Sequence, residues 1–240
     1  MTAAIDPSRH TVALVVTAHP DDAEFLFGAT IAWLIEHDVA VFYLVCSDGA
    51  LGGADPAAER DSVARIRCAE QVAAARMLGV RDVTFLGLPD GTVVPTLELR
   101  TAIAAQVRLR RPTVVLTHYP HRVLAAPVEA SHPDHLAVGE ATLAAIYPTA
   151  GSAMARLEFE GRALAAWRPA EIWLTGYGDR DEYCIDAVRH LSSKVAAILC
   201  HTSQLGDTPE ETPPWLLDWM RGIGVEHGFE YGESFTRIML

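Results

Sequence analysis

Val12-Ala13-Leu14-Val15-Val16-Thr17-Ala18-His19-Pro20-Asp21-Asp22 carries an apolar, β-branched run straight into a polar motif. The run over residues 12–17 predicts a short strand that is buried on both faces. A second motif, Ser131-His132-Pro133-Asp134-His135, repeats the order His-Pro-Asp more than a hundred residues later. Proline stiffens the backbone beside the polar side chains of both motifs. Each motif could supply half of the residues of one functional site. A folded α/β enzyme would bring two such motifs together at one edge of its sheet.

Strand and helix patterns alternate over the first half of the chain. Apolar runs predict further strands at residues 39–45, 83–86 and 114–117. Helical spacing predicts helices at residues 25–37, 57–78 and 97–109. The alternation predicts a Rossmann-like α/β fold, a mostly parallel sheet with right-handed crossovers and helices on both faces.

The pattern is weaker after residue 150. There we expect strands at 171–175 and 235–240, a helix at 192–201 and a short helix after Pro213. No linker is evident, so residues 1–240 are predicted to form a single domain. Ligands of open parallel sheets bind beyond the carboxyl ends of the strands. Because both motifs follow predicted strands, we expect the active site at that rim.

Composition and charge narrow the classes of function. Hydrophobic residues make up 50% of the chain, enough for a sizeable core. The net charge of −12 argues against a nucleic acid or an anionic membrane surface as partner, because both need clustered Lys and Arg. No signal-peptide pattern and no apolar run long enough to span a membrane is evident, so a cytoplasmic protein is expected. The oligomeric state is left open, and a homo-oligomer is possible.

The two motifs contain the residue types of a catalytic zinc site. Such a site has three protein ligands and a fourth position for water. His19 and Asp22 are three residues apart, and His135 is the natural third ligand. Fe²⁺ or Co²⁺ could also occupy a site of two histidines and one aspartate, since metal availability matters as much as affinity.

Three further residues of the motifs suit proton transfer. Asp21 lies beside the ligands, where it can take a proton from water. His132 can donate a proton to a leaving group or stabilise an oxyanion. Asp134 can hydrogen-bond the His132 ring and hold its orientation. The alternative for Asp21 or Asp22 is an ordinary helix N-cap. His118 and His121 are predicted at the same rim, either close to the site or simply solvated.

The motifs also resemble those of a known family. The sequence Ala-His-Pro-Asp-Asp after a first apolar strand, followed much later by His-Pro-Asp-His, is similar to the LmbE-like (PIG-L) deacetylases. The agreement continues in chain order through Ser47-Asp48-Gly49, Arg67-Cys68-Ala69-Glu70, Pro89-Asp90-Gly91, His201-Thr202-Ser203-Gln204 and Glu233-Ser234-Phe235.

The resemblance implies a zinc-dependent hydrolase that removes the N-acetyl group from an N-acetylglucosamine-type moiety of a small glycoconjugate. It implies His19, Asp22 and His135 as zinc ligands. It further implies a set of catalytic and substrate-binding residues: Asp21 as general base, His132 as general acid or oxyanion stabiliser, Asp134 tuning His132, and Arg67 and Asp48 on the substrate.

Two alternatives remain beside this reading. One is an amidase that acts on a thiol conjugate or another N-acylated amine. The other is a non-catalytic protein that uses the scaffold to bind a sugar or metabolite. The chain also departs from some family members, which carry a tyrosine just before the second motif. Here that stretch reads Val128-Glu129-Ala130-Ser131, and Tyr119 lies further back. The loop 118–131 is where we expect substrate specificity to be set.

Overall fold

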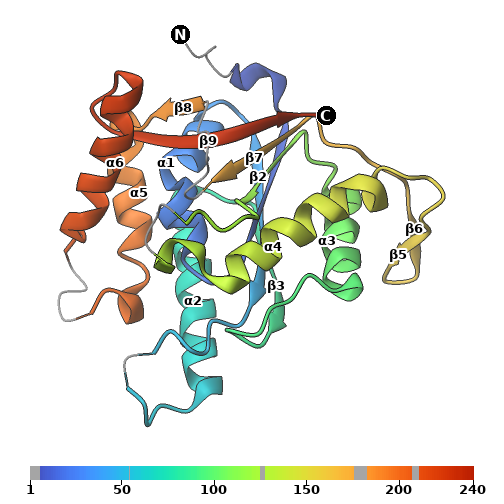
Figure 1. The fold of residues 1–240 in the computed structure, drawn as a ribbon, viewed down its shortest axis with the longest axis horizontal. Helices are drawn as coiled ribbons and strands as arrows, with labels where there is room; N and C mark the ends of the chain where they lie inside the picture. Colours follow the sequence, from blue (N-terminus) through green and yellow to red (C-terminus); the bar gives the residue numbers. More distant parts are fainter. Residues whose placement is uncertain (1–5, 54, 125–127, 176–182, 207–210) are drawn as a thin grey trace.

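A seven-stranded sheet forms the centre of the protein (Figure 1). The computed structural model describes residues 6–53, 55–124, 128–175, 183–206 and 211–240. The strand order is β3-β2-β1-β4-β7-β9-β8, and the pairs from β3 through β7 are parallel. Strand β9 runs antiparallel to both of its neighbours. The strands of this sheet are β1 (Val12–Thr17), β2 (Ala40–Ser47), β3 (Asp82–Leu88), β4 (Val114–His118), β7 (Glu171–Thr175), β8 (Tyr183–Asp186) and β9 (Gly232–Met239).

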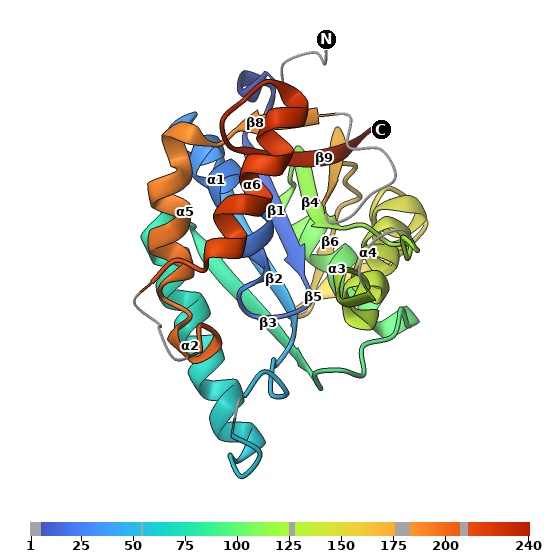
Figure 2. The same ribbon diagram turned by 60° about the vertical axis from the view of Figure 1, so that its left-hand side comes forward.

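Helices cover both faces of this sheet (Figure 2). Residues of α1, α2 and α5 share one apolar core with the strands, and residues of α3 and α4 share the other. The helices are α1 (Asp22–Glu36), α2 (Arg60–Leu78), α3 (Leu97–Arg110), α4 (Pro133–Ala144), α5 (Leu191–Ile198) and α6 (Pro214–His227). Shorter helical segments are Pro7–Arg9, Val128–Ser131, Ala145–Ala150, Val188–His190 and Thr202–Gln204.

Strand β1 shows why the first apolar run is continuous rather than alternating. Ala13 and Val15 face the core beneath α1 and α2, while Leu14 and Val16 face the core beneath α3 and α4. A strand covered on both faces needs apolar residues at every position. The predicted Rossmann-like α/β fold is confirmed.

Several elements differ from the sequence-based expectation. Helix α1 begins at Asp22 rather than at Phe25, so the first motif itself opens the helix. Helix α4, which begins inside the second motif, was not expected. A small antiparallel hairpin, β5 (Leu157–Phe159) with β6 (Arg162–Leu164), and the edge strand β8 were not expected either. These strands are three or four residues long and partly exposed, so they lack an apolar run.

Within the described ranges, no helix is both long and apolar enough to cross a membrane.

Candidate metal centre and active site

The two sequence motifs meet at the carboxyl edge of the sheet. His19 follows β1 and Asp22 opens α1, while His135 lies in the first turn of α4. The His19 Nδ1 and His135 Nε2 atoms are 3.2 Å apart, although 116 residues separate them in the chain. The parallel pairing of β1 with β4 explains this contact, because it brings the segments that follow both strands to the same rim.

Donor atoms of His19, Asp22 and His135 lie close together, with one Asp22 oxygen near each of the two histidines. The His19 Nδ1 atom is 3.5 Å from Asp22 Oδ2, and the His135 Nε2 atom is 3.1 Å from Asp22 Oδ1. Ligands of a tetrahedral zinc ion with bonds of about 2.0–2.2 Å lie roughly 3.3–3.6 Å apart. The three separations of 3.1, 3.2 and 3.5 Å are close to this range. The donor set therefore fits a small divalent metal ion.

The outer nitrogen of His19 faces two further carboxylates. Its Nε2 atom lies 3.2 Å from Asp134 Oδ2 and 3.1 Å from Asp90 Oδ1. The amides of Gly91 and Val93 donate to Asp134 and hold it in place. Carboxylates behind a metal-binding histidine orient its ring and raise its basicity. Asp134 and Asp90 occupy this position behind the candidate ligand His19.

The position of Asp134 differs from the expected contact with the His132 ring. The Asp134 carboxylate faces His19, whereas only its backbone amide donates to His132 Nδ1, at 3.2 Å. Because Nδ1 accepts a hydrogen bond, a neutral His132 carries its proton on Nε2. Burial, with the positive charge of nearby histidines, lowers the pKa of His132 and favours this neutral form. The ring lies edge-on to His19, with centroids 4.8 Å apart.

Negative charge is concentrated around His19. Burial alone would lower the pKa of His19, but hydrogen bonds to Asp134, Asp22 and Asp90 outweigh it and raise this pKa to about 12. A proton on His19 and a metal ion would therefore compete to neutralise the negative charge of the same cluster of carboxylates. This competition is a second reason why the residues present fit a cation.

His118, the last residue of β4, is buried directly against the ligands. Its ring stacks on His135 with centroids 4.1 Å apart and an interplanar angle of 12°. Burial, reinforced by His135, lowers the pKa of His118 to about 4, so the ring is neutral at pH 7. The Ala18 amide donates to His118 Nε2 at 3.0 Å. That nitrogen also lies within ligand distance of Asp22 and His135, but its lone pair is already used, so we assign His118 to packing rather than ligation.

Asp21 has an unusual backbone conformation at the start of α1. Its φ of 104° and ψ of −30° lie in a region that non-glycine residues rarely adopt, which costs of order 1–3 kcal/mol. Arg67, itself buried, donates to the Asp21 carboxylate at 3.0 Å and to the carbonyls of Pro20 and Gly49. Burial raises the pKa of Asp21 to about 6, against the lowering effect of Arg67.

Arg67 and Asp48, both expected on the substrate, make contacts within the protein. Arg67 binds Asp21 and the two carbonyls named above. Asp48 accepts hydrogen bonds from the amides of Ala50 and Asp90, which orders the two loops at the rim. These contacts hold the walls of the site, and a direct contact of either side chain with substrate stays a prediction.

The loop expected to set specificity is described only in part, since residues 125–127 lie outside the described ranges. Tyr119 packs on the α3–α4 side of the core and edge-on to the exposed His121, with ring centroids 5.8 Å apart. Neither residue belongs to a cluster of metal-ligand atoms in the described part of the chain.

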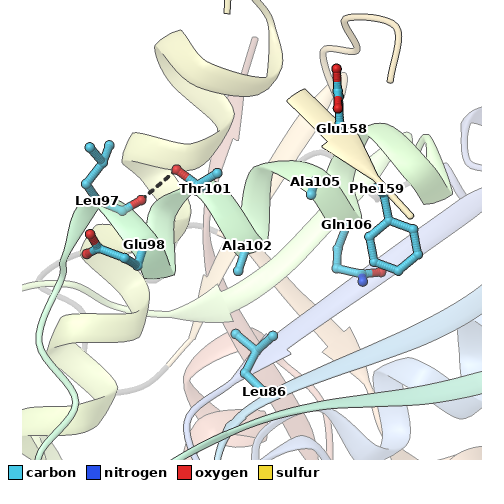
Figure 3. Close-up of a pocket in the computed structure, with 9 residues that line it drawn as sticks. All are labelled: Leu86, Leu97, Glu98, Thr101, Ala102, Ala105, Gln106, Glu158 and Phe159. Carbon is cyan, nitrogen blue, oxygen red and sulfur yellow. Dashed lines mark hydrogen bonds between the residues drawn. The ribbon is translucent and has the colours of Figure 1, made fainter. Parts of the chain in front are cut away.

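An apolar groove of about 560 Å³ lies elsewhere, between α3, β3 and the β5–β6 hairpin (Figure 3). Leu86, Leu97 and Phe159 line it, with Glu98, Glu158 and Gln106 among the polar residues. None of its lining residues belongs to the metal cluster.

A family model described as "PIG-L: GlcNAc-PI de-N-acetylase" matches residues 14–146, which is more than half of the chain. The chain belongs to the PIG-L family. The matched segment begins in β1 and ends just beyond α4, so it includes both motifs and all three candidate ligands.

Two relatives named as deacetylases are similar to this chain over 58% and 93% of its length. A diacetylchitobiose deacetylase from Thermococcus kodakarensis is 28% identical, over 93% of this chain and 80% of the relative. A probable N-acetyl-alpha-D-glucosaminyl L-malate deacetylase 2 from Bacillus anthracis is 34% identical, over 58% of this chain and 59% of the relative.

Solved structures share the fold. An N,N'-diacetylchitobiose deacetylase from Pyrococcus horikoshii superposes with a TM-score of 0.86 at 26% identity, covering 96% of this chain and 84% of that one. A 4-carboxy-2-hydroxymuconate hydratase from Pseudomonas putida gives a TM-score of 0.77 at 20% identity, covering 96% and 97%. The hydratase shows that this fold alone does not decide the reaction, so function has to be argued from the site.

Sequence reasoning gave no role to Asp90, and it placed His118 at the rim without deciding whether this residue lies close to the site or is solvated. Asp90 lies in the Pro-Asp-Gly turn after β3, and its contact with His19 joins positions 71 residues apart in the chain. His118 ends β4, a strand whose neighbour β1 leads directly into the first motif. The available signal was positional: both residues are polar and follow strands of the parallel sheet, where side chains converge.

Proposed function

We propose that the protein is a zinc-dependent hydrolase that removes the N-acetyl group from an N-acetylglucosamine-type unit of a small glycoconjugate. The observation that carries the proposal is the close approach of donor atoms from His19, Asp22 and His135, with Asp21 immediately before the helix that Asp22 begins. The names of the relatives support the reaction and the acylated sugar. The attached group differs among them, so the acetamido sugar is the shared element.

The proposed reaction needs a metal ion, a proton-transfer group and an oxyanion stabiliser. Zinc held by His19, Asp22 and His135 would supply a Lewis acid for the acyl carbonyl and lower the pKa of water to about 7. Fe²⁺ or Co²⁺ could supply the same function at this donor set.

Asp21 would accept the proton of the attacking water. With a pKa of about 6, its carboxylate is largely ionised at pH 7 and yet more basic than an ordinary aspartate. Arg67 donates to the Oδ2 atom, so the Oδ1 atom would be the one to accept the proton. The carboxylate therefore has the protonation state that a general base requires.

His132 would stabilise the oxyanion that develops on the acyl oxygen. Its Nδ1 atom is occupied by the Asp134 amide, so Nε2–H is the donor that remains, and a neutral imidazole donates this hydrogen bond without losing its proton. As the amide C–N bond breaks, the proton that Asp21 accepted from water passes to the departing nitrogen. The products are acetate and the free amino sugar, and the two proton transfers balance the addition of one water molecule.

The test is amine release from a panel of N-acetylglucosamine conjugates, including diacetylchitobiose and conjugates of malate and inositol. The protein is loaded with zinc, and His135→Ala serves as the blank. We expect release from at least one conjugate, with the relative rates defining the preferred attached group. Absence of release from the whole panel by protein that binds one zinc ion would contradict the proposed substrate class.

A further inference from the structure

Helix α2 holds Asp21 at two separate points. Arg67 donates to the Asp21 carboxylate, and one helical turn later the Gln71 side chain accepts a hydrogen bond from the Asp21 backbone amide at 2.8 Å. Residues four apart lie on the same face of a helix, so both contacts come from one side of α2. Arg67 restrains the side chain, whereas Gln71 restrains the backbone from which that side chain projects.

The backbone contact is the one that the local conformation needs. Asp21 has a φ of 104°, and no side-chain capping bond of its own stabilises the start of α1. A positive φ in a residue with a Cβ persists only where surrounding contacts enforce it. In the part of the chain that the structure describes, the Asp21 amide donates to Gln71 Oε1. Losing this acceptor would free Asp21 to relax and would carry its carboxylate away.

The orientation of the Gln71 amide is itself determined. Gln71 is fully buried, and its Nε2 atom donates to both carboxylate oxygens of Glu24, at 3.0 and 2.9 Å. A reversed amide would place its oxygen against that carboxylate and its NH₂ group against the Asp21 amide. Glu24 therefore directs Gln71 Oε1 toward Asp21.

Glu24 is in turn held by His201. The two side chains are fully buried, and His201 Nε2 lies 3.1 Å from Glu24 Oε2. Burial lowers the pKa of His201, but its hydrogen bond to Glu24 outweighs this and raises the pKa overall, which favours a charged imidazole beside the carboxylate. The chain of contacts joins the first turn of α1, the middle of α2 and the segment after α5, which lie on one side of the sheet (Figure 2).

We propose that Gln71 is a positioning residue for the general base, holding Asp21 in its positive-φ conformation through a carboxamide that Glu24 and His201 orient. The catalytic part of this inference rests on the proposed function, whereas the conformational part does not. An apolar side chain of the same length would fill the space but leave the Asp21 amide without its acceptor. Gln71 therefore acts through Asp21 and makes no contact with substrate.

The test compares Gln71→Met with Gln106→Met, a buried glutamine on α3 that lines the groove of Figure 3 on the opposite face of the sheet. A displacement of about 1 Å in a catalytic group can lower turnover roughly a hundredfold. We expect Gln71→Met to lower kcat by about ten- to a hundredfold, with KM and bound zinc within about twofold of the parent. Gln106→Met should leave all three within about twofold. Parental kcat in folded, zinc-loaded Gln71→Met would overturn the proposal.

A charge-conserving exchange separates positioning from packing. Combining Glu24→Gln with Gln71→Glu keeps an oxygen acceptor for the Asp21 amide and an NH₂ donor between the two side chains. We expect this double variant to recover most of the kcat lost in Gln71→Met. Recovery supports the contact, whereas a kcat as low as that of Gln71→Met would count against it.

Crystal structures of the parent and of Gln71→Met decide the conformational part even if no conjugate is hydrolysed. Asp21 should leave its positive φ in the variant, and an unchanged Asp21 backbone would overturn the inference. If Gln71→Met does not fold, hydrogen exchange of the Asp21 amide in the parent protein replaces it. Slow exchange supports the contact with Gln71, and exchange at the rate of an exposed amide overturns it.

Discussion

Asp134 Oδ2 lies 3.2 Å from His19 Nε2, on the nitrogen that faces away from Asp22 and His135. His19 belongs to the first sequence motif and Asp134 to the second. Their contact therefore links the two motifs on the side of His19 that faces away from the candidate metal position. Asp134 is fully buried and receives amide hydrogen bonds from Gly91 and Val93. These contacts fix the orientation of the His19 ring without a bound metal ion.

Asp134→Asn should weaken metal binding without removing a ligand. Replacing the carboxylate by an amide removes the negative charge that makes His19 a stronger metal ligand. Changes in such outer contacts typically cost about 10–100-fold in metal affinity. The zinc dissociation constant, measured by competition with a chelating dye, checks this. Asp218→Asn, on the exposed face of α6, is the matched control. Equal affinities for Asp134→Asn and the parent would show that the contact does not tune the metal site.

Asp21→Asn should separate metal binding from turnover. Arg67 can still donate to the amide oxygen, and the ligands His19, Asp22 and His135 are untouched, so about one zinc ion should remain bound. The amide cannot accept a proton from water, and loss of a general base typically lowers the rate by about 10²–10⁴-fold. Bound zinc and kcat are measured on the same preparation. Turnover at the parental rate would remove Asp21 from the mechanism.

Lys194→Met should destabilise the fold strongly. Lys194 is fully buried, and its Nζ atom donates to Glu233 and to the Phe25 carbonyl, both at 2.6 Å. Removing one partner leaves the buried Glu233 carboxylate uncompensated, which typically costs about 3–5 kcal/mol. Urea unfolding checks this against Arg189→Met, whose exposed pair with Glu36 should contribute less than about 1 kcal/mol. Similar losses in the two variants would contradict the difference in burial.

How far the sequence predicts this protein depends on whether a feature leaves a local pattern. Strand β1 was predicted with its observed bounds because burial on both faces demands an apolar residue at each position. The β5–β6 hairpin and β8 were missed because short, partly exposed strands make no such demand.

Whether a residue of the candidate site could be predicted also depends on whether it belongs to a local sequence pattern. The candidate metal ligands lie in two compact motifs, so they could be proposed from the sequence, and the structure brings them close together. Asp134 was assigned to His132, its near neighbour in the chain, although the fold directs its carboxylate to His19, 115 residues away. His118 could be placed at the rim because it ends a predicted strand, but its packing on His135 could not be predicted. Asp90 and Gln71 depend on contacts between distant segments, for which a single sequence contains no periodicity.

Glu171→Gln should make stability less dependent on acid pH. Glu171, at the start of β7, is buried and forms a two-bond pair with Arg237 of the neighbouring strand β9. Burial raises the pKa of Glu171, but the bonds from Arg237 and Trp173 outweigh it and lower the pKa below its ordinary value of 4.5. The folded state therefore prefers the ionised carboxylate, and its stabilising effect is complete above about pH 4.5. As pH falls further, the unfolded chain binds a proton first, and the effect is lost as pH passes through the folded-state pKa.

At pH 7 the substitution should cost about 3–5 kcal/mol, because it breaks a buried ion pair and leaves Arg237 without its partner charge. The difference in unfolding free energy between parent and variant should narrow as the pH falls below about 4.5, because Glu171 in the parent becomes protonated in acid and then resembles the amide. Urea unfolding across this range measures it, with the exposed Glu158→Gln as control. A difference that stays constant throughout the acid range below pH 4.5 would mean that Glu171 is not the group that links the β7–β9 pair to pH.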